Sequence, residues 1–168
     1  MAHPKDSLVQ HLSDDGTSTG SVNMAVDGSV TPVDFWFQIA APHRSVCLNR
    51  LIFLIRDNNA LAAEKFGGLS ELTNGLTLGF FDTSGNLLSD CFGGVPQKSN
   101  ADLGGIFYDT EPSHYGSGDD FLHGRFSFDK WLNGGACFAD DTILKATISD
   151  DLSGLVAFRI ALFGTYLT

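Results

Sequence analysis

Residues 45–56 read SVCLNRLIFLIR and contain the longest purely apolar run of the chain, residues 51–55. A β-strand sends successive side chains to opposite faces of its sheet. Here both alternating sets are mostly apolar: Val46, Leu48, Ile52 and Leu54 form one set, and Cys47, Leu51, Phe53 and Ile55 form the other. A strand that is apolar on both faces is covered on both sides. The stretch therefore predicts a central strand that is buried within the domain or packed against a neighbouring subunit.

Other segments carry one apolar face and one polar face, as half-buried strands do. These segments are residues 34–39, 76–80, 121–128, 142–149 and 156–166. In residues 34–39, Phe35 and Phe37 share a face with Ile39. In residues 142–149, Lys145 and Thr147 lie on the face opposite the apolar residues. The pattern predicts a chain built almost entirely of strands.

Turn-forming residues separate the predicted strands. Residues 82–86 (DTSGN) predict a hairpin turn, and residues 150–154 (DDLSG) predict a tight hairpin loop between the last two strands. The exception is residues 60–74, where ALAAEKF followed by two glycines predicts one or two helical turns. We therefore expect an all-β fold, a single β-sandwich that is jelly-roll-like, with one short helical insertion.

The 168 residues predict one sandwich domain, residues 23–168, preceded by an N-terminal arm, residues 1–22. The arm is polar and rich in turn residues, and Leu8, Val9 and Leu12 are its few apolar groups. Ordering a backbone costs about 1–2 kcal/mol per residue, which exceeds what three apolar side chains return. We therefore expect the arm to add a strand to a sheet edge, preferably that of a neighbouring subunit.

Composition excludes some classes of protein. Apolar residues make up 43% of the chain and charged residues 18%, which excludes an intrinsically disordered protein. The formal net charge of −10 argues against a nucleic-acid partner, because phosphate contacts need clustered Lys and Arg. Since 17 of the 20 acidic residues are Asp, which favours turns, we expect the acidity to lie mostly in loops.

The cysteines and the N-terminal residues bear on the compartment. Cys47, Cys91 and Cys137 are odd in number and widely spaced, unlike a zinc site or a disulfide framework. Cys47 lies in the apolar strand, which predicts a buried free thiol and synthesis in a reducing cytoplasm. The first residues lack the apolar core of a signal peptide, and no apolar run is long enough for a membrane span. We expect no membrane association.

No stretch has the spacing of a catalytic or metal-binding motif. Residues 115–118 (YGSG) lack the nucleophile-elbow spacing, and three Glu residues give no clear glycosidase pair. The Asp pairs at 119–120, 140–141 and 150–151 are explained by Asx turns, with calcium as the lesser alternative. We predict a non-enzymatic chain that needs no cofactor and no metal.

Five aromatic residues fall at strand ends or on faces opposite the apolar sets. They are Trp36, Phe107, Tyr108, Tyr115 and Trp131. Three roles remain open for them: core packing, a subunit interface, and stacking against a sugar. Together with Leu8, Val9 and Leu12, they form the predicted interface set. If the aromatic residues stack against a sugar, the chain is a carbohydrate-binding module for host-surface glycan, which is the alternative to a structural protein. Such a module would place Trp36 and Trp131 side by side on one face.

The chain contains the short motifs RLIFLIRD (50–57), EKFGGL (64–69), LTNGL (72–76), KSNAD (98–102), YD (108–109), GSGDD (116–120) and DDLSGL (150–155). Together they resemble a family of small structural proteins found among the virion genes of tailed bacteriophages. The resemblance implies a virion subunit made in the host cytoplasm, whose partners are its own copies and other virion proteins. Its expected place is the head–tail or tail assembly, with a capsid decoration (cement) protein as the alternative. The arm carries none of this pattern.

Overall fold

The structure is a computed structural model that describes most of the predicted strands. The described residues are 7–13, 23–38, 45–57, 72–91, 96, 107–115, 119–127, 136–139 and 141–167. Within them, side chains are described for residues 12–13, 23–38, 45–52, 72–91, 96, 137–139 and 141–165. The predicted helical insertion falls almost wholly on residues outside this part.

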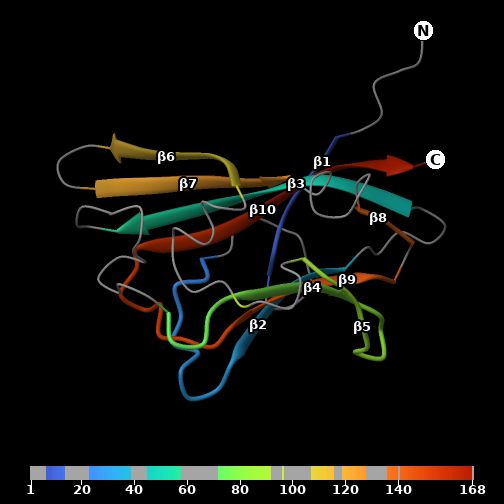
Figure 1. The fold of residues 1–168 in the computed structure, drawn as a ribbon, viewed down its shortest axis with the longest axis horizontal. Coiled ribbons are helices and arrows are strands. Elements are labelled where there is room, and N and C mark those ends of the chain that lie inside the picture. Colours follow the sequence, from blue (N-terminus) through green and yellow to red (C-terminus); the bar gives the residue numbers. More distant parts are fainter. Residues whose placement is uncertain are drawn as a thin grey trace, which may run out of the picture.

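The described residues form strands and no helix, and the strands build two antiparallel sheets (Figure 1). The strands are β1 (Ser7–His11), β2 (Val33–Gln38), β3 (Ser45–Asp57), β4 (Thr77–Phe81), β5 (Leu87–Asp90), β6 (Phe107–Tyr115), β7 (Asp119–Ser127), β8 (Ala136–Phe138), β9 (Ile143–Ile148) and β10 (Ala157–Leu167). The larger sheet has the order β1-β10-β3-β7-β6, with β8 also paired to β3. The smaller sheet has the order β2-β9-β4-β5. The predicted all-β class is confirmed for the described part.

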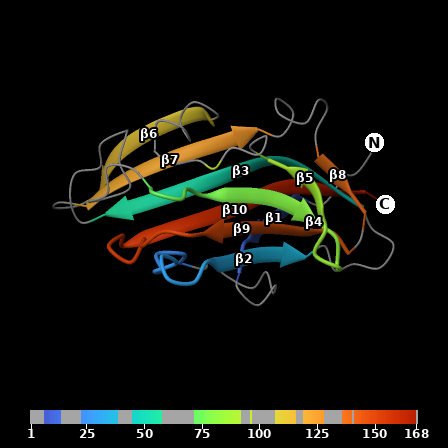
Figure 2. The ribbon, with the colours of Figure 1, turned by 60° about the horizontal axis from the view of Figure 1, so that its bottom comes forward.

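The two sheets form two layers in Figure 1, and Figure 2 shows the smaller sheet in front of the larger one. Buried side chains of both sheets form one hydrophobic core between them. From the smaller sheet, Phe35, Phe37, Phe80, Leu144 and Ile148 are buried in it. They belong to one cluster with buried residues of the larger sheet: Val46, Leu48, Leu51, Phe158, Ile160 and Leu162. Full burial of each such side chain contributes about 1.5–3 kcal/mol, so this apolar layer holds the sheets together.

A β-bulge in β3 changes the face assignment made from the sequence. The register with β10 shifts between Phe163 and Gly164, whose partners are Arg50 and Leu48, so Asn49 is the extra residue. An extra residue inverts the alternation beyond it. Leu51 therefore joins Leu48 in the core, and Ile52 takes the other face, the reverse of the prediction. At the bulge the backbones approach closely: a Cβ on Gly164 would lie 2.6 Å from the Cys47 carbonyl oxygen.

Residues 7–13 of the N-terminal arm pair with the chain's own sheets, in place of the neighbouring subunit that we expected. β1 pairs with β10, and Leu12, which donates its backbone N–H to Ile160, is fully buried in the core. The next residue, Ser13, exchanges two backbone hydrogen bonds with Trp36 on the edge of β2. The arm thus crosses from one sheet to the other and closes one side of the molecule. Few apolar side chains are enough to order residues 7–13, because their backbone also forms hydrogen bonds with existing sheet edges.

The connection between β9 and β10 corrects a second expectation. The predicted hairpin loop at residues 150–154 joins strands of different sheets, so it is a crossover. Asp150 fixes this crossover: its buried carboxylate accepts hydrogen bonds from the backbone N–H groups of Thr73, Asn74 and Gly75. By contrast, the hairpin at 82–86 is confirmed, since β4 pairs with β5 across it.

The cysteines also differ from the prediction. Cys47 faces Cys137 in the register of β3 and β8, and the two form a disulfide, so the predicted free thiol at Cys47 is wrong. An odd number of cysteines does not exclude a disulfide, because two of the three are bonded here and one is free. Cys91 is the free thiol; burial raises its pKa, and the neighbouring Asp90 raises it further. The thiol argument for a reducing compartment therefore no longer holds.

The structure brings one finding on membranes. In the part of the chain that the structure describes, no helix is long and apolar enough to cross a membrane.

We predict that Leu12→Ala lowers the free energy of unfolding by about 2–5 kcal/mol, because it opens a cavity in the core. Urea unfolding of the full chain measures this. Leu88→Ala is the matched control: its side chain is 55% exposed, so the change should stay within about 0.5 kcal/mol. Equal effects of the two substitutions would contradict the placement of the arm in its own core.

We predict that Asp150→Ala lowers the free energy of unfolding by about 3 kcal/mol, since three backbone donors lose a charged acceptor. The control is Asp151→Ala. Asp151 is exposed, and among the described residues its carboxylate accepts hydrogen bonds from Ser153, in its own turn. Thermal and urea unfolding should show a much smaller loss for this control. A neutral result for Asp150→Ala would show that the crossover is held by other contacts.

Candidate functional site

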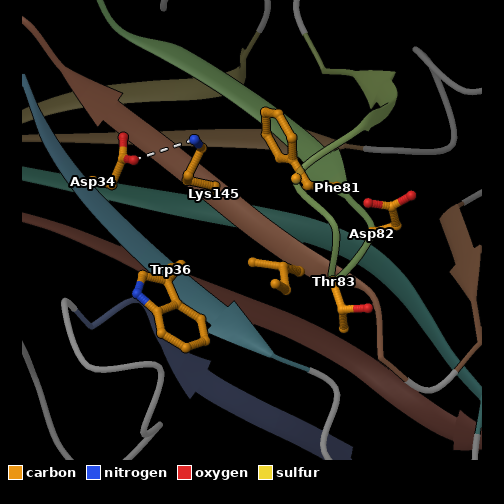
Figure 3. A pocket seen from close by; sticks show the side chains of 8 residues that line it. Asp34, Trp36, Phe81, Asp82, Thr83 and Lys145 are labelled. Carbon is orange, nitrogen blue, oxygen red and sulfur yellow. Dashed lines mark hydrogen bonds and ion pairs between the residues drawn. The ribbon is translucent and has the colours of Figure 1, made fainter.

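The outer face of the smaller sheet carries a pocket bordered by aromatic and charged side chains (Figure 3). In β2, Phe35 and Phe37 are buried, while Asp34 and Trp36 lie on the opposite, outward face. In β9, Leu144 and Ala146 are buried, and the outward residues include Lys145. The strict alternation of these two strands therefore presents polar and aromatic groups together.

Strand register decides which of these outward residues are neighbours. Trp36 of β2 is opposite Lys145 of β9, and Lys145 is opposite Gly79 of β4. One row away, Ile143 of β9 is opposite Phe81 of β4. Because β9 lies between β2 and β4, Trp36 and Phe81 stand on the two sides of the β9 residues. The pocket is about 230 Å³ in volume. Its lining residues are Asp34, Trp36, Phe81, Asp82, Thr83, Gly85, Ile143 and Lys145.

Asp34 and Lys145 form the polar side of the pocket. The Asp34 carboxylate accepts a hydrogen bond from the Thr147 hydroxyl at 2.6 Å and one from the Lys145 ammonium at 3.2 Å. The Lys145 side chain is 31% exposed and that of Asp34 is 46% exposed. Both groups thus remain accessible to a ligand while being held in place by neighbouring strands.

Asp82 begins the turn at the opposite rim. Its carboxylate accepts hydrogen bonds from the Asn86 side chain and from the backbone N–H groups of Asn86 and Ser84. The hydrogen bonds from Asn86, first the side chain and then the backbone, lower the pKa of Asp82 below its ordinary value. Asp82 therefore keeps its negative charge at neutral pH. Gly85 has a φ of 84°, which a glycine adopts readily, and this lets the turn close.

The apolar side of the pocket is formed by Trp36, Phe81 and Ile143. The Lys145 ammonium lies 4.5 Å from the centroid of the Phe81 ring, within the range of a cation–π contact. Trp36 is half-buried, and its backbone is fixed by the two hydrogen bonds to Ser13. The rings are thus positioned by paired strands, with one turn completing the rim.

The side chains of the lining decide which chemistry the pocket can support. Glycoside hydrolysis needs one carboxylic acid that is kept protonated by a raised pKa, whereas the pKa of Asp82 is lowered. What the pocket offers is an aromatic surface beside a fixed donor and a fixed acceptor.

The structure locates some of the predicted interface residues and leaves others undecided. Trp36 lines the pocket, and Leu12 is buried in the core. The backbones of Leu8, Val9, Phe107, Tyr108 and Tyr115 lie in β1 and β6, but their side chains fall outside the described part, as does all of Trp131. Whether these residues form an interface therefore stays a prediction.

Of the eight lining residues, only Trp36 was among the predicted interface residues. Asp82, Thr83 and Gly85 were predicted only as part of a turn, and Asp34, Phe81, Ile143 and Lys145 were not predicted as site residues. The alternation of residues 142–149 did place Lys145 on an outward face. The sequence does not show which strands are neighbours: Trp36 and Lys145 are 109 positions apart and come together through the pairing of β2 with β9. A pocket made by three strands cannot be found from the period of each strand alone.

The described residues offer no site for the calcium ion that the sequence left as an alternative. They contain no group of three or more His, Cys, Asp or Glu side chains that could hold a metal ion. Asp151 accepts a hydrogen bond from the backbone N–H of Ser153, as the Asx-turn interpretation predicted. Asp150 instead accepts hydrogen bonds from residues 73–75, which are distant in the sequence. No family model, no curated protein and no solved structure matches the chain.

We predict that Asp34→Ala changes the free energy of unfolding by about 1 kcal/mol or less, because half-exposed ion pairs contribute little. Urea unfolding should therefore separate it clearly from Asp150→Ala. Asp27→Ala provides a control of similar kind, since Asp27 is exposed and bonds within its own loop to Ser29. A loss as large as that of Asp150→Ala would mean that Asp34 holds the sheet together.

Proposed function

We propose that the chain is a jelly roll. The observation that carries this proposal is a set of nested antiparallel pairs: β1 with β10, β2 with β9, β3 with β8, and β4 with β5. Successive pairs fall alternately in the larger and the smaller sheet. A long hairpin rolled up in this way has the two four-stranded sheets of a jelly roll. In this scheme β6 and β7 are an inserted hairpin that extends the larger sheet along β3.

The function that we propose is that of a non-enzymatic structural subunit of a tailed-phage virion. Jelly rolls are a recurrent architecture of viral capsid proteins and of lectins, so the nested pairing supports this class. The motif resemblance points to the same class. The net charge of −10 suits a protein on the outside of a particle, away from packaged DNA. Its proposed partners are copies of itself and other virion proteins.

The disulfide supports a place at the particle surface. Disulfides persist in oxidising surroundings, whereas the cytoplasm keeps thiols reduced. Cys137 is exposed and Cys47 half-buried, so an oxidant can reach the pair in the folded chain. A virion protein made in the host cytoplasm meets such surroundings after release. The proposal therefore includes closure of Cys47–Cys137 in the released particle.

Two places on the particle remain in the proposal. The first is the head–tail or tail assembly, and the alternative is a capsid decoration protein. Residues 7–13 of the arm pair with the chain's own strands, so the arm does not favour one of these places over the other. Both places require closed, symmetric contacts between copies, but they differ in copy number.

We predict that mass spectrometry of purified particles detects this chain, at a copy number of tens for a ring or of hundreds for a decoration protein. Quantification against a virion protein of known copy number distinguishes the two. The unbound fraction of the same lysate is the control. A chain that is abundant in that fraction and absent from washed particles would contradict the virion proposal.

A further inference from the structure

We propose that the pocket on the outer face of the smaller sheet binds one uncharged sugar ring, stacked on Trp36 and hydrogen-bonded by Asp34 and Lys145. This inference concerns a ligand site, and it does not depend on where in a particle the chain is placed. Figure 3 shows Asp34, Lys145 and Trp36 on one side of the pocket, and Phe81, Asp82 and Thr83 on the other.

The size of the pocket limits the ligand. Pockets for drug-sized ligands have volumes of roughly 300–1,000 Å³, and this one measures about 230 Å³. It lies on the face of a sheet, so a ligand is held from one side. A single ring fits these dimensions, with any further rings extending along the sheet surface.

The apolar wall suits the face of a pyranose ring. One face of such a ring is covered by C–H groups, which pack against the flat surface of an aromatic side chain and exclude water from it. Trp36 supplies that surface, and Ile143 and Phe81 continue the apolar wall across β9 and β4. A flexible aliphatic ligand would gain less, since it would lose more conformational freedom against a flat, rigid wall.

The polar side matches the hydroxyl groups at the edge of the ring. An ionised carboxylate has about four acceptor positions, and an ammonium has three donors. Among the described residues, Asp34 receives two hydrogen bonds and Lys145 donates one of them. Acceptor and donor capacity therefore remain side by side. Adjacent sugar hydroxyls, each of which donates and accepts, can use both.

The charges of the pocket select against ionic ligands. Two carboxylates, Asp34 and Asp82, face one ammonium, that of Lys145, which leaves one net negative charge. An acidic sugar would meet this charge and that of the whole chain, and would be repelled. A cationic ligand would compete for the place above Phe81 that the Lys145 ammonium already occupies at 4.5 Å. A neutral sugar avoids both conflicts.

The test uses the full chain on an array of immobilised neutral hexoses and N-acetylhexosamines and of sugars ending in uronic or sialic acid. We expect binding to neutral sugars. Trp36→Ala should weaken it about tenfold, which corresponds to about 1.4 kcal/mol, whereas Trp36→Phe should retain part of it. Asp34→Asn should also weaken it. Val30→Ala is the control, because Val30 is 90% exposed and lies outside the pocket lining.

Two further readouts make the result decisive. Binding of a neutral sugar should change little between low and high salt, because screening acts on charged partners. Unfolding curves of each variant show whether it is folded. The proposal is overturned if folded wild-type chain binds no neutral sugar on the array, if Trp36→Ala and Val30→Ala bind alike, or if acidic sugars bind better than neutral ones.

Discussion

The backbone pairing of β3 is the constraint on which the rest of the structure depends. One edge of β3 pairs with β10 from Ser45 to Arg56, and the other edge is shared by β8, at Val46–Leu48, and β7, at Arg50–Asp57. The bulge residue Asn49 lies where these two partners divide. By inverting the alternation there, the bulge places Leu51 in the core together with Val46 and Leu48. A strand without it would turn Leu51 away from the core.

The site follows from this arrangement. The core between the sheets uses the inward residues of β2, β4 and β9, which commits their outward residues to the opposite face. The arm, fixed to β10 and then to Trp36, closes one side and holds the edge of β2. The pocket is therefore formed mostly by paired strands, with only the turn after Phe81 added. Binding groups held by regular strands are positioned more precisely than groups on loops.

The sequence predicted strands β2, β3, β4, β7, β9 and β10 because alternation is a local property, but it did not predict β6 or β8. It predicted the outward positions of Lys145 and Trp36 and the turn at residues 82–86 for the same reason. It failed where pairing between distant strands decides the outcome: the bulge at Asn49, the Cys47–Cys137 disulfide, and the crossover at residues 150–154. The pocket belongs to this second group. The predicted helical insertion lies almost wholly outside the described residues and stays a prediction.

The order of the strands around β3 is the central claim, and the cysteines test it most directly. We expect peptide mapping of the oxidised, folded chain to find Cys47 linked to Cys137, because β8 lies beside β3 in that register. Alkylation should reach the buried Cys91 only after denaturation. A disulfide that involves Cys91, or a Cys137 that stays free in the oxidised folded chain, would contradict the pairing of β8 with β3 and the nested order built on it.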